Sequence, residues 1–156
     1  HDRYRDFLEG KYHICIVRGE HNWNEEKRLL WQDPLCAFSK DSLNMDLLPS
    51  YPYIHYMTDP LFQNVLDDWW YAHYKKPPFT IIETDAMDTC LKMVQEGLGF
   101  TLLSRSCGQD TPHIHPTVLT TVEGKPLLRE TWMFYRHNYH LLTSVKAFVD
   151  FMKEKY

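Results

Sequence analysis

The stretch Glu83-Thr-Asp-Ala-Met-Asp-Thr-Cys-Leu-Lys-Met-Val-Gln-Glu-Gly-Leu-Gly-Phe-Thr-Leu-Leu-Ser104 reads as the end of a strand, a helix and a second strand. Asp85 is placed to cap the helix, and Asp88 occupies the capping-box position. Gly97 suits the left-handed residue that ends a helix, and Gly99 suits a tight turn into the next strand. The apolar residues follow the spacing of one helix face: Met87, Cys90, Leu91, Val94 and Leu98.

A strand–helix–strand unit of this kind belongs in a parallel sheet. It places the helix start, residues 84–86, at the carboxyl end of the first strand. Open α/β sheets bind their ligands at that edge. A core element without any ligand is the alternative reading, and the stretch alone favours neither.

Three phrases in this chain resemble the effector-binding domain of LysR-type transcriptional regulators. The phrase Val94-x-x-Gly97-x-Gly99 with its following strand is similar to the helix-to-strand passage of that family. Residues 7–19 resemble its "L-x-x-G-x-x-D-x-x-I" passage, and residues 53–70 resemble the strand and helix that enter its second subdomain. Two positions depart from the family pattern, because His13 replaces the usual Asp and Ser104-Arg105 replaces the usual Pro.

The resemblance implies an α/β fold of two Rossmann-like lobes joined by two crossovers, of the periplasmic-binding-protein type II kind. Residues 1–42 and 133–156 would form effector-binding subdomain I, and residues 43–132 would form subdomain II. It also implies that the opening elements of the first lobe, and a helix-turn-helix domain, would precede His1. The cleft between the lobes would bind one small molecule, and movement of the lobes would be the signal.

Composition limits the partners of this segment. The chain has 156 residues, a net charge of −4, 44% hydrophobic and 24% charged residues, which is typical of a globular domain. An acidic chain without a Lys/Arg cluster is poorly suited to phosphate backbones, so we expect DNA contact only through the helix-turn-helix domain of the parent protein. No segment approaches the length of a membrane span, and we expect no signal peptide. The four cysteines lack CxxC spacing and indicate buried, reduced side chains in the cytoplasm: Cys15, Cys36, Cys90 and Cys107.

Periodicity and turn residues predict the remaining elements. We expect a strand at residues 12–17 buried on both faces, two strands at residues 27–31 and 34–39, and a helix from Asp59-Pro60 to about residue 74. Further strands are expected at residues 53–57, 79–83, 118–121 and 128–136. A last helix at residues 141–155 would face inward with Leu142, Val145, Phe148, Val149 and Met152.

Two arginines are candidate ligand-binding residues. Arg18 directly follows an apolar strand, where a guanidinium can grip a carboxylate with two hydrogen bonds. Arg129 opens the strand near the return crossover, and with Arg18 it would clamp a polycarboxylate from the opposite lobe. Ordinary surface ion pairs are the alternatives, with Glu20 for Arg18 and with Glu130 or Glu123 for Arg129.

Three further residues lie where strands lead into helices. Met57 and Thr58 join a strand to the helix that Asp59 would cap, and backbone N–H groups with a hydroxyl there form an anion seat. Thr84 occupies the same position before the next helix. Capping alone is the alternative reading of both places.

Metal binding and catalysis have weak support. His113-Ile-His115 and the His137/His140 pair lack a third ligand at a suitable spacing, and loop histidines are the simpler reading. The chain has no G-x-S-x-G, HExxH, phosphate-loop or Rossmann motif. We therefore expect no metal, no cofactor and no enzyme activity.

The resemblance implies a bacterial, cytoplasmic regulator that senses a small anionic metabolite and works as a dimer or tetramer. The resemblance is greatest to citrate-sensing regulators of carbon metabolism in Gram-positive bacteria. Together with the two arginines, it favours a di- or tricarboxylate such as citrate as the ligand. Two alternatives share the architecture: an extracytoplasmic solute-binding protein, and an enzyme on the same two-lobe fold. A signal peptide upstream would favour the first, and turnover of a ligand would favour the second.

Overall fold

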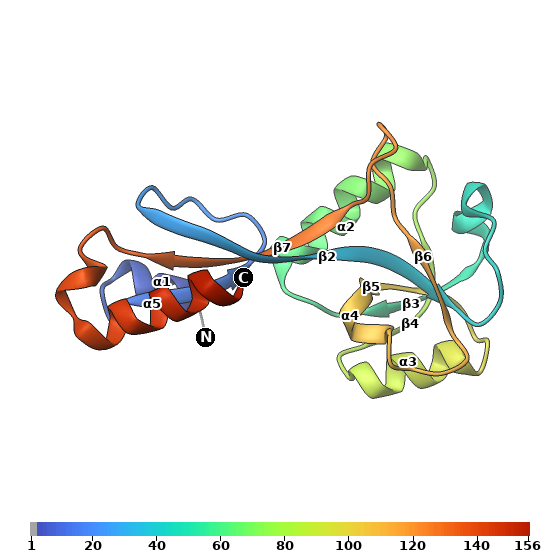
Figure 1. Ribbon diagram of the computed structural model, residues 1–156. Helices are drawn as coiled ribbons and strands as arrows, with labels where there is room; N and C mark the ends of the chain where they lie inside the picture. Colours follow the sequence, from blue (N-terminus) through green and yellow to red (C-terminus); the bar gives the residue numbers. More distant parts are fainter. Residues whose placement is uncertain (1–2) are drawn as a thin grey trace. The chain divides into compact units, whose positions relative to one another are not determined.

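The computed structural model describes residues 3–156, and the chain forms two compact units (Figure 1). Unit 1 comprises His1–Gln32 and Arg129–Tyr156, and unit 2 comprises Asp33–Leu128. The expected boundaries lay at residues 42/43 and 132/133. The division falls earlier at both places because two long strands, β2 (Glu26–Ser39) and β7 (Leu128–Tyr135), carry the chain from one unit to the other. Both crossing points lie within these strands, so no loop marks the border between the units.

In unit 1, a small sheet has a helix on each face. Strand β1 (Ile14–Arg18) pairs antiparallel with β7, with Ile14 opposite Tyr135. One face packs Cys15, Val17 and Phe134 against Phe7 of α1 (Arg3–Leu8). Because side chains alternate along a strand, the other face carries Met133 and Tyr135. That face packs against Val149 and Met152 of α5 (Thr143–Lys155), which follows the short helix η2 (Tyr139–Leu141).

The expectation that β1 is buried on both faces was wrong. Cys15 and Val17 are buried, whereas Ile16 is 48% exposed. Strand β1 lies at the end of the strand order β1-β7-β2, and α5 covers only part of its outer face. Ile16, Tyr12 and Phe148 are among the residues that line a hollow of about 650 Å³ beside it. Phe148 of α5 and Leu142, the N-cap residue before this helix, are exposed as well, although both were expected to face inward.

Unit 2 is built on parallel strands. Strand β3 (Pro52–Tyr56) pairs parallel with β4 (Phe79–Thr84). On its other side it bonds to the start of β5 (Thr101–Ser104), through Ile54 N–H to the Phe100 carbonyl at 2.9 Å and Phe100 N–H to the Pro52 carbonyl at 3.0 Å. Strand β2 pairs antiparallel with β5 and with β6 (His115–Val118). The parallel strand–helix–strand unit expected from residues 83–104 is therefore present, with β3 between its two strands.

Helices cover both faces of this sheet. Helix α2 (Pro60–His73) packs Phe62, Leu66, Trp69 and Trp70 against Tyr53 and Phe100. Helix α3 (Met87–Gln95) packs Cys90, Leu91 and Val94 against Ile54 and Leu103. Tyr53 and Ile54 are neighbours in β3 and point to opposite faces, so α2 and α3 lie on opposite sides, as in doubly wound α/β folds. The short helices η1 (Met45–Ser50) and α4 (Arg105–Gly108) complete the unit.

Three local expectations need correction. Strands 27–31 and 34–39 form one strand, β2, with Pro34 inside it. Asp85 does not cap α3: the helix starts at Met87, its N-cap is Ala86 without a side-chain bond, and the Thr84 hydroxyl accepts the Ala86 N–H at 3.1 Å. The strand expected at residues 118–121 is β6 and begins earlier, at His115.

The helix ends follow the sequence more closely. The Asp59 carboxylate accepts the Phe62 N–H at 2.9 Å, which confirms the N-cap of α2. Gly97 has a φ of 76°, and the N–H of Leu98 bonds to the Met93 carbonyl, so α3 ends in a left-handed cap. Gly99 is needed for a different reason than the predicted turn: a Cβ there would lie 2.4 Å from the Pro52 carbonyl oxygen.

Candidate functional site

The carboxyl ends of β3, β4 and β5 lie at one edge of the unit 2 sheet. Tyr56 is level with Thr84 in the parallel register, and the Met57 N–H bonds to the Thr84 carbonyl at 2.8 Å. The structure therefore brings Met57, Thr58 and Thr84 together, three of the residues that the sequence singled out. We call these three residues the strand-end seat.

The hydroxyl of Thr84 retains donor capacity in the strand-end seat. It accepts the Ala86 N–H, and a threonine hydroxyl can still donate its own proton to an anion. Thr58 donates to the Asp59 carboxylate over 3.5 Å, a bond at the limit of useful length. Asp59 itself is occupied in capping α2 and adds negative charge there. The Met57 and Ala86 N–H groups are already bonded to Thr84, so an anion would be held mainly by the two hydroxyls.

Sequence reasoning missed a third strand end. The bridge between Tyr53 and Phe100 sets the β3–β5 register, and continuing it places Ser104 level with Met57. The Ser104 hydroxyl is buried and finds no hydrogen-bond partner among residues 3–156. Ser106 follows in α4, and both its N–H and its hydroxyl donate to the buried Asp33 carboxylate. The available signal was the polar residue that directly follows the run 100–103, at the end of the predicted strand.

Both candidate arginines belong to unit 1. Arg18 ends β1 opposite Thr131 of β7, and the Gly19 N–H bonds to the Glu130 carbonyl at 2.9 Å. Arg129 is two residues before Thr131, so it lies diagonally across from Arg18 on the same face. The expectation that the two arginines come from opposite lobes was therefore wrong. Long side chains at diagonal positions can reach one another's ligand.

Glu130, the acid next to Arg129 in the chain, has hydrogen-bond partners of its own. The Glu130 carboxylate accepts the Gln32 side-chain amide at 3.0 Å and the Trp132 indole N–H at 3.0 Å. Thr131 is 2% exposed, and its hydroxyl has no hydrogen-bond partner within the described chain. Arg18 is exposed and Arg129 is half-buried.

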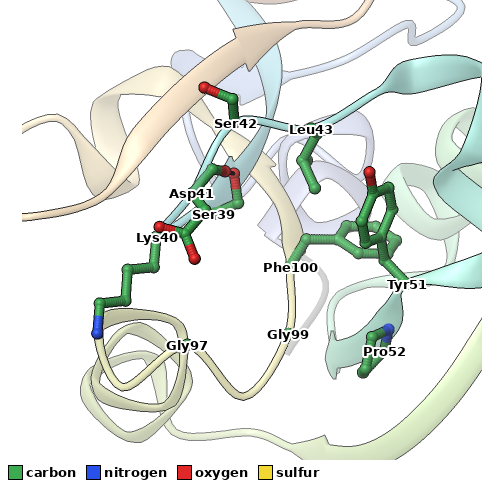
Figure 2. A pocket seen from close by; sticks show the side chains of 10 residues that line it. All are labelled: Ser39, Lys40, Asp41, Ser42, Leu43, Tyr51, Pro52, Gly97, Gly99 and Phe100. Carbon is green, nitrogen blue, oxygen red and sulfur yellow. Dashed lines mark hydrogen bonds between the residues drawn. The ribbon is translucent and has the colours of Figure 1, made fainter.

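A separate cavity lies at the amino ends of β3 and β5 (Figure 2). Its volume is about 130 Å³, and the end of β2, the start of β3 and the α3–β5 turn form its wall. Figure 2 shows Lys40, Asp41 and Ser42 around a space that Gly97 and Gly99 leave open. Parallel α/β sheets bind ligands at the carboxyl ends of their strands, so this cavity is at the wrong edge for the effector.

The cysteines are poorly placed for nucleophilic chemistry. All four are free thiols, and Cys15, Cys36 and Cys90 are buried. Burial raises the pKa of the Cys36 thiol to about 11 and also raises the pKa of Cys90. Thiols of this kind stay protonated and unreactive at neutral pH. Within residues 3–156, no group of three or more His, Cys, Asp or Glu side chains is arranged to hold a metal ion, and no helix is long and apolar enough to cross a membrane.

Comparison with known proteins assigns the family. The family model of the LysR substrate-binding domain matches residues 1–156. This chain belongs to that family. The expected two-lobe α/β class is thereby confirmed, and the chain is the effector-binding domain of a LysR-type regulator.

Relatives of this LysR substrate-binding domain are regulators by name. It is 34% identical over 144 residues to the uncharacterized HTH-type transcriptional regulator YraN of Bacillus subtilis, covering 92% of this chain and 50% of YraN. It is 27% identical over 152 residues to YkuM of the same organism, covering 96% of this chain and 52% of YkuM. The chain thus spans about half the length of these curated relatives.

Solved structures show the same fold. The regulatory domain of CcmR from Synechocystis PCC6803, determined in complex with 2-PG, superposes with a TM-score of 0.71 at 14% identity, over 97% of this chain and 77% of that one. Full-length HypT from Salmonella typhimurium gives a TM-score of 0.69 at 11% identity, over 97% of this chain and 54% of HypT. The LysR substrate-binding domain described here shares their architecture.

Proposed function

We propose that this domain controls transcription in its parent protein by sensing a small di- or tricarboxylate, with citrate as the first candidate. The observation that carries the proposal is the pair of arginines on one face of β1 and β7, in a chain whose net charge is −4. Guanidinium groups are the preferred protein partners of carboxylates. We assign carboxylate binding to two sets of groups. One is Arg18 and Arg129 of unit 1, and the other is the strand-end seat of unit 2.

The regulator role is favoured over the two alternatives by the relatives. YraN and YkuM are both HTH-type transcriptional regulators by name, and that class is not one of enzymes or of solute carriers. An effector changes such a protein only if it binds two of its states with different affinity. We propose that the parent is a bacterial cytoplasmic oligomer, in which carboxylate binding shifts the arrangement of DNA-bound subunits.

Citrate is expected to stabilise this domain against thermal unfolding, and the stabilisation is expected to depend on both arginines. At 100 times Kd, ligand linkage gives about 2.7 kcal/mol. Arg18→Ala and Arg129→Ala each remove a charge-assisted hydrogen bond worth roughly 1.5–3 kcal/mol, so binding should weaken by about 10- to 100-fold. Arg18→Lys should also bind more weakly, because an ammonium cannot reproduce the planar two-point contact. Melting curves with and without millimolar citrate measure these effects.

The matched control is Arg5→Ala, which removes the same charge from α1, where Arg5 pairs with Glu9 at 3.2 Å. It should leave the citrate shift unchanged. Wild-type binding by both arginine variants would refute the assignment of these two side chains. A melting temperature that no di- or tricarboxylate raises would refute the carboxylate proposal as a whole.

DNA binding is expected of the full-length parent and not of this domain alone. The domain is acidic, and Lys75 and Lys76 do not extend into a basic stripe that could follow a phosphate backbone. A gel-shift titration at ~50 mM salt, with the same promoter duplex for both proteins, measures the difference. A specific shift of the duplex by the isolated domain would contradict the proposal that only the parent protein binds DNA. A full-length protein that shifts no duplex would contradict the regulator proposal.

A further inference from the structure

His55 of β3 has both ring nitrogens against acceptor oxygens. Its Nδ1 lies 3.1 Å from the Glu83 carboxylate of β4, and its Nε2 lies 2.8 Å from the side-chain carbonyl of Gln63 on α2. The Gln63 amide nitrogen in turn donates to the Asp67 carboxylate at 2.9 Å. The four side chains form one chain of hydrogen bonds that joins β4, β3 and α2. We call these four residues the His55 network.

Only a protonated His55 satisfies the whole network. A neutral imidazole has one donor and one acceptor, so one of its nitrogens would face an acceptor oxygen without a proton between them. Turning the Gln63 amide around would supply a donor to His55 but would set the amide oxygen against the Asp67 carboxylate. Loss of the His55 proton therefore removes at least one hydrogen bond from the network.

Other titratable groups around His55 are acidic or neutral. Glu83 faces it from β4 and Asp67 lies near it on α2, while the Tyr53 ring of β3 has its centroid 5.7 Å from the imidazole. Burial raises the pKa of Tyr53, so its phenol stays neutral. His55, Tyr53 and Asp67 line a hollow of about 150 Å³, and no Lys or Arg of the described chain lines it.

The His55 network fastens the segments that form the strand-end seat. His55 is two residues before Met57, and Glu83 directly precedes Thr84. The Gln63 N–H bonds to the carbonyl of Asp59, in the turn that follows Thr58. The His55 side chain thus ties the end of β3, the end of β4 and the first turn of α2 to one another. When protonated, it also adds a positive charge two residues before Met57.

We propose that His55 is a positioning residue whose proton holds the strand-end seat in shape and makes effector binding weaken as pH rises. The ligand in this inference is taken from the proposed function. The structural half, in which the His55 proton shapes the seat, does not depend on that function. The seat should rearrange with the protonation of His55 whether or not a ligand is present. At high pH the seat loses one restraint and a nearby positive charge, and both losses disfavour an anion.

Nuclear magnetic resonance of the ligand-free domain tests the structural half. In a pH titration, the backbone amides of Met57, Thr58 and Thr84 should shift in step with the His55 ring. His55→Gln should abolish that common transition. His137→Gln is the matched control, because His137 also meets a carboxylate, that of Glu26 at 2.8 Å, but lies in unit 1. Seat amides that do not follow His55, or that titrate unchanged in His55→Gln, would overturn the proposal.

Calorimetric titration with citrate at pH 6 and pH 8 tests the regulatory half. Citrate itself titrates in this range, so each protein's affinity at pH 6 is first divided by its affinity at pH 8. The measure is this ratio for wild type divided by the same ratio for His55→Gln. We expect that quotient to be about fivefold, the worth of one net hydrogen bond, and to be unity for His137→Gln against wild type. A quotient of unity for His55→Gln would overturn the regulatory role. Failure of citrate to bind any of these proteins, with the common amide transition intact, would refute the proposed ligand and leave the positioning role supported.

Discussion

Replacing Trp70 with alanine is expected to lower the free energy of unfolding by about 3–5 kcal/mol. Trp70 is 2% exposed and lies between α2 and the sheet of unit 2. Its ring is parallel to that of Phe100 within 2°, with centroids 6.3 Å apart, and its indole N–H donates to the Lys76 carbonyl at 2.8 Å. Truncation leaves a cavity and an unpaired carbonyl, and both reduce stability.

Urea unfolding followed by circular dichroism measures this effect without relying on tryptophan fluorescence. Tyr71→Ala is the control, because Tyr71 is the next residue of α2 and is 58% exposed. Its effect should stay within about 0.5 kcal/mol. Equal midpoints for the two variants would contradict the described packing of α2. A natively folded domain is stable by only about 5–15 kcal/mol, so this loss is a large fraction of its total stability.

Gly99→Ala is expected to destabilise unit 2 by about 3 kcal/mol, at the upper end of the range for overpacking. The added methyl would lie 2.4 Å from the Pro52 carbonyl oxygen, which is a backbone atom and cannot rotate away. Relief requires β3 and β5 to separate, and this breaks the bond from the Phe100 N–H to the same carbonyl. Hydrogen exchange should therefore show lost protection at the amides of Phe100 and Ile54.

Gly124→Ala separates this steric effect from backbone strain. Gly124 has a φ of 83°, but a methyl group added there would meet no atom within 4 Å, so only the left-handed conformation opposes alanine. Its effect should be about 1 kcal/mol, with protection of Ile54 unchanged. An effect of Gly99→Ala no larger than that of Gly124→Ala would show that β3 and β5 are not in the close contact described.

Local features of the candidate site were well predicted from sequence. The Asp59-Pro60 pair indicated where α2 begins, and the Asp59 cap is present. Thr84 was placed at the end of a strand before a helix, and it lies there. Such positions depend on capping, turn residues and periodicity within a few residues, which a single chain displays directly. The capping role of Asp85 was predicted wrongly. Thr84 and Asp85 can each bond a nearby backbone N–H, and only the final geometry selects between them.

The sequence by itself determined the elements of this protein: the amphipathic α2 and α3, the glycine-bounded turn after α3, the acidic composition that disfavours direct DNA contact, and the phrases that resemble its family. Tertiary structure alone decided which residues meet. It put Arg18 and Arg129 on one face, exposed Ile16 at the edge of a sheet, and joined His55 to Glu83, which is 28 residues away in the chain. The physical reason is that strand order and register depend on packing between distant segments, and no local pattern of side chains encodes it.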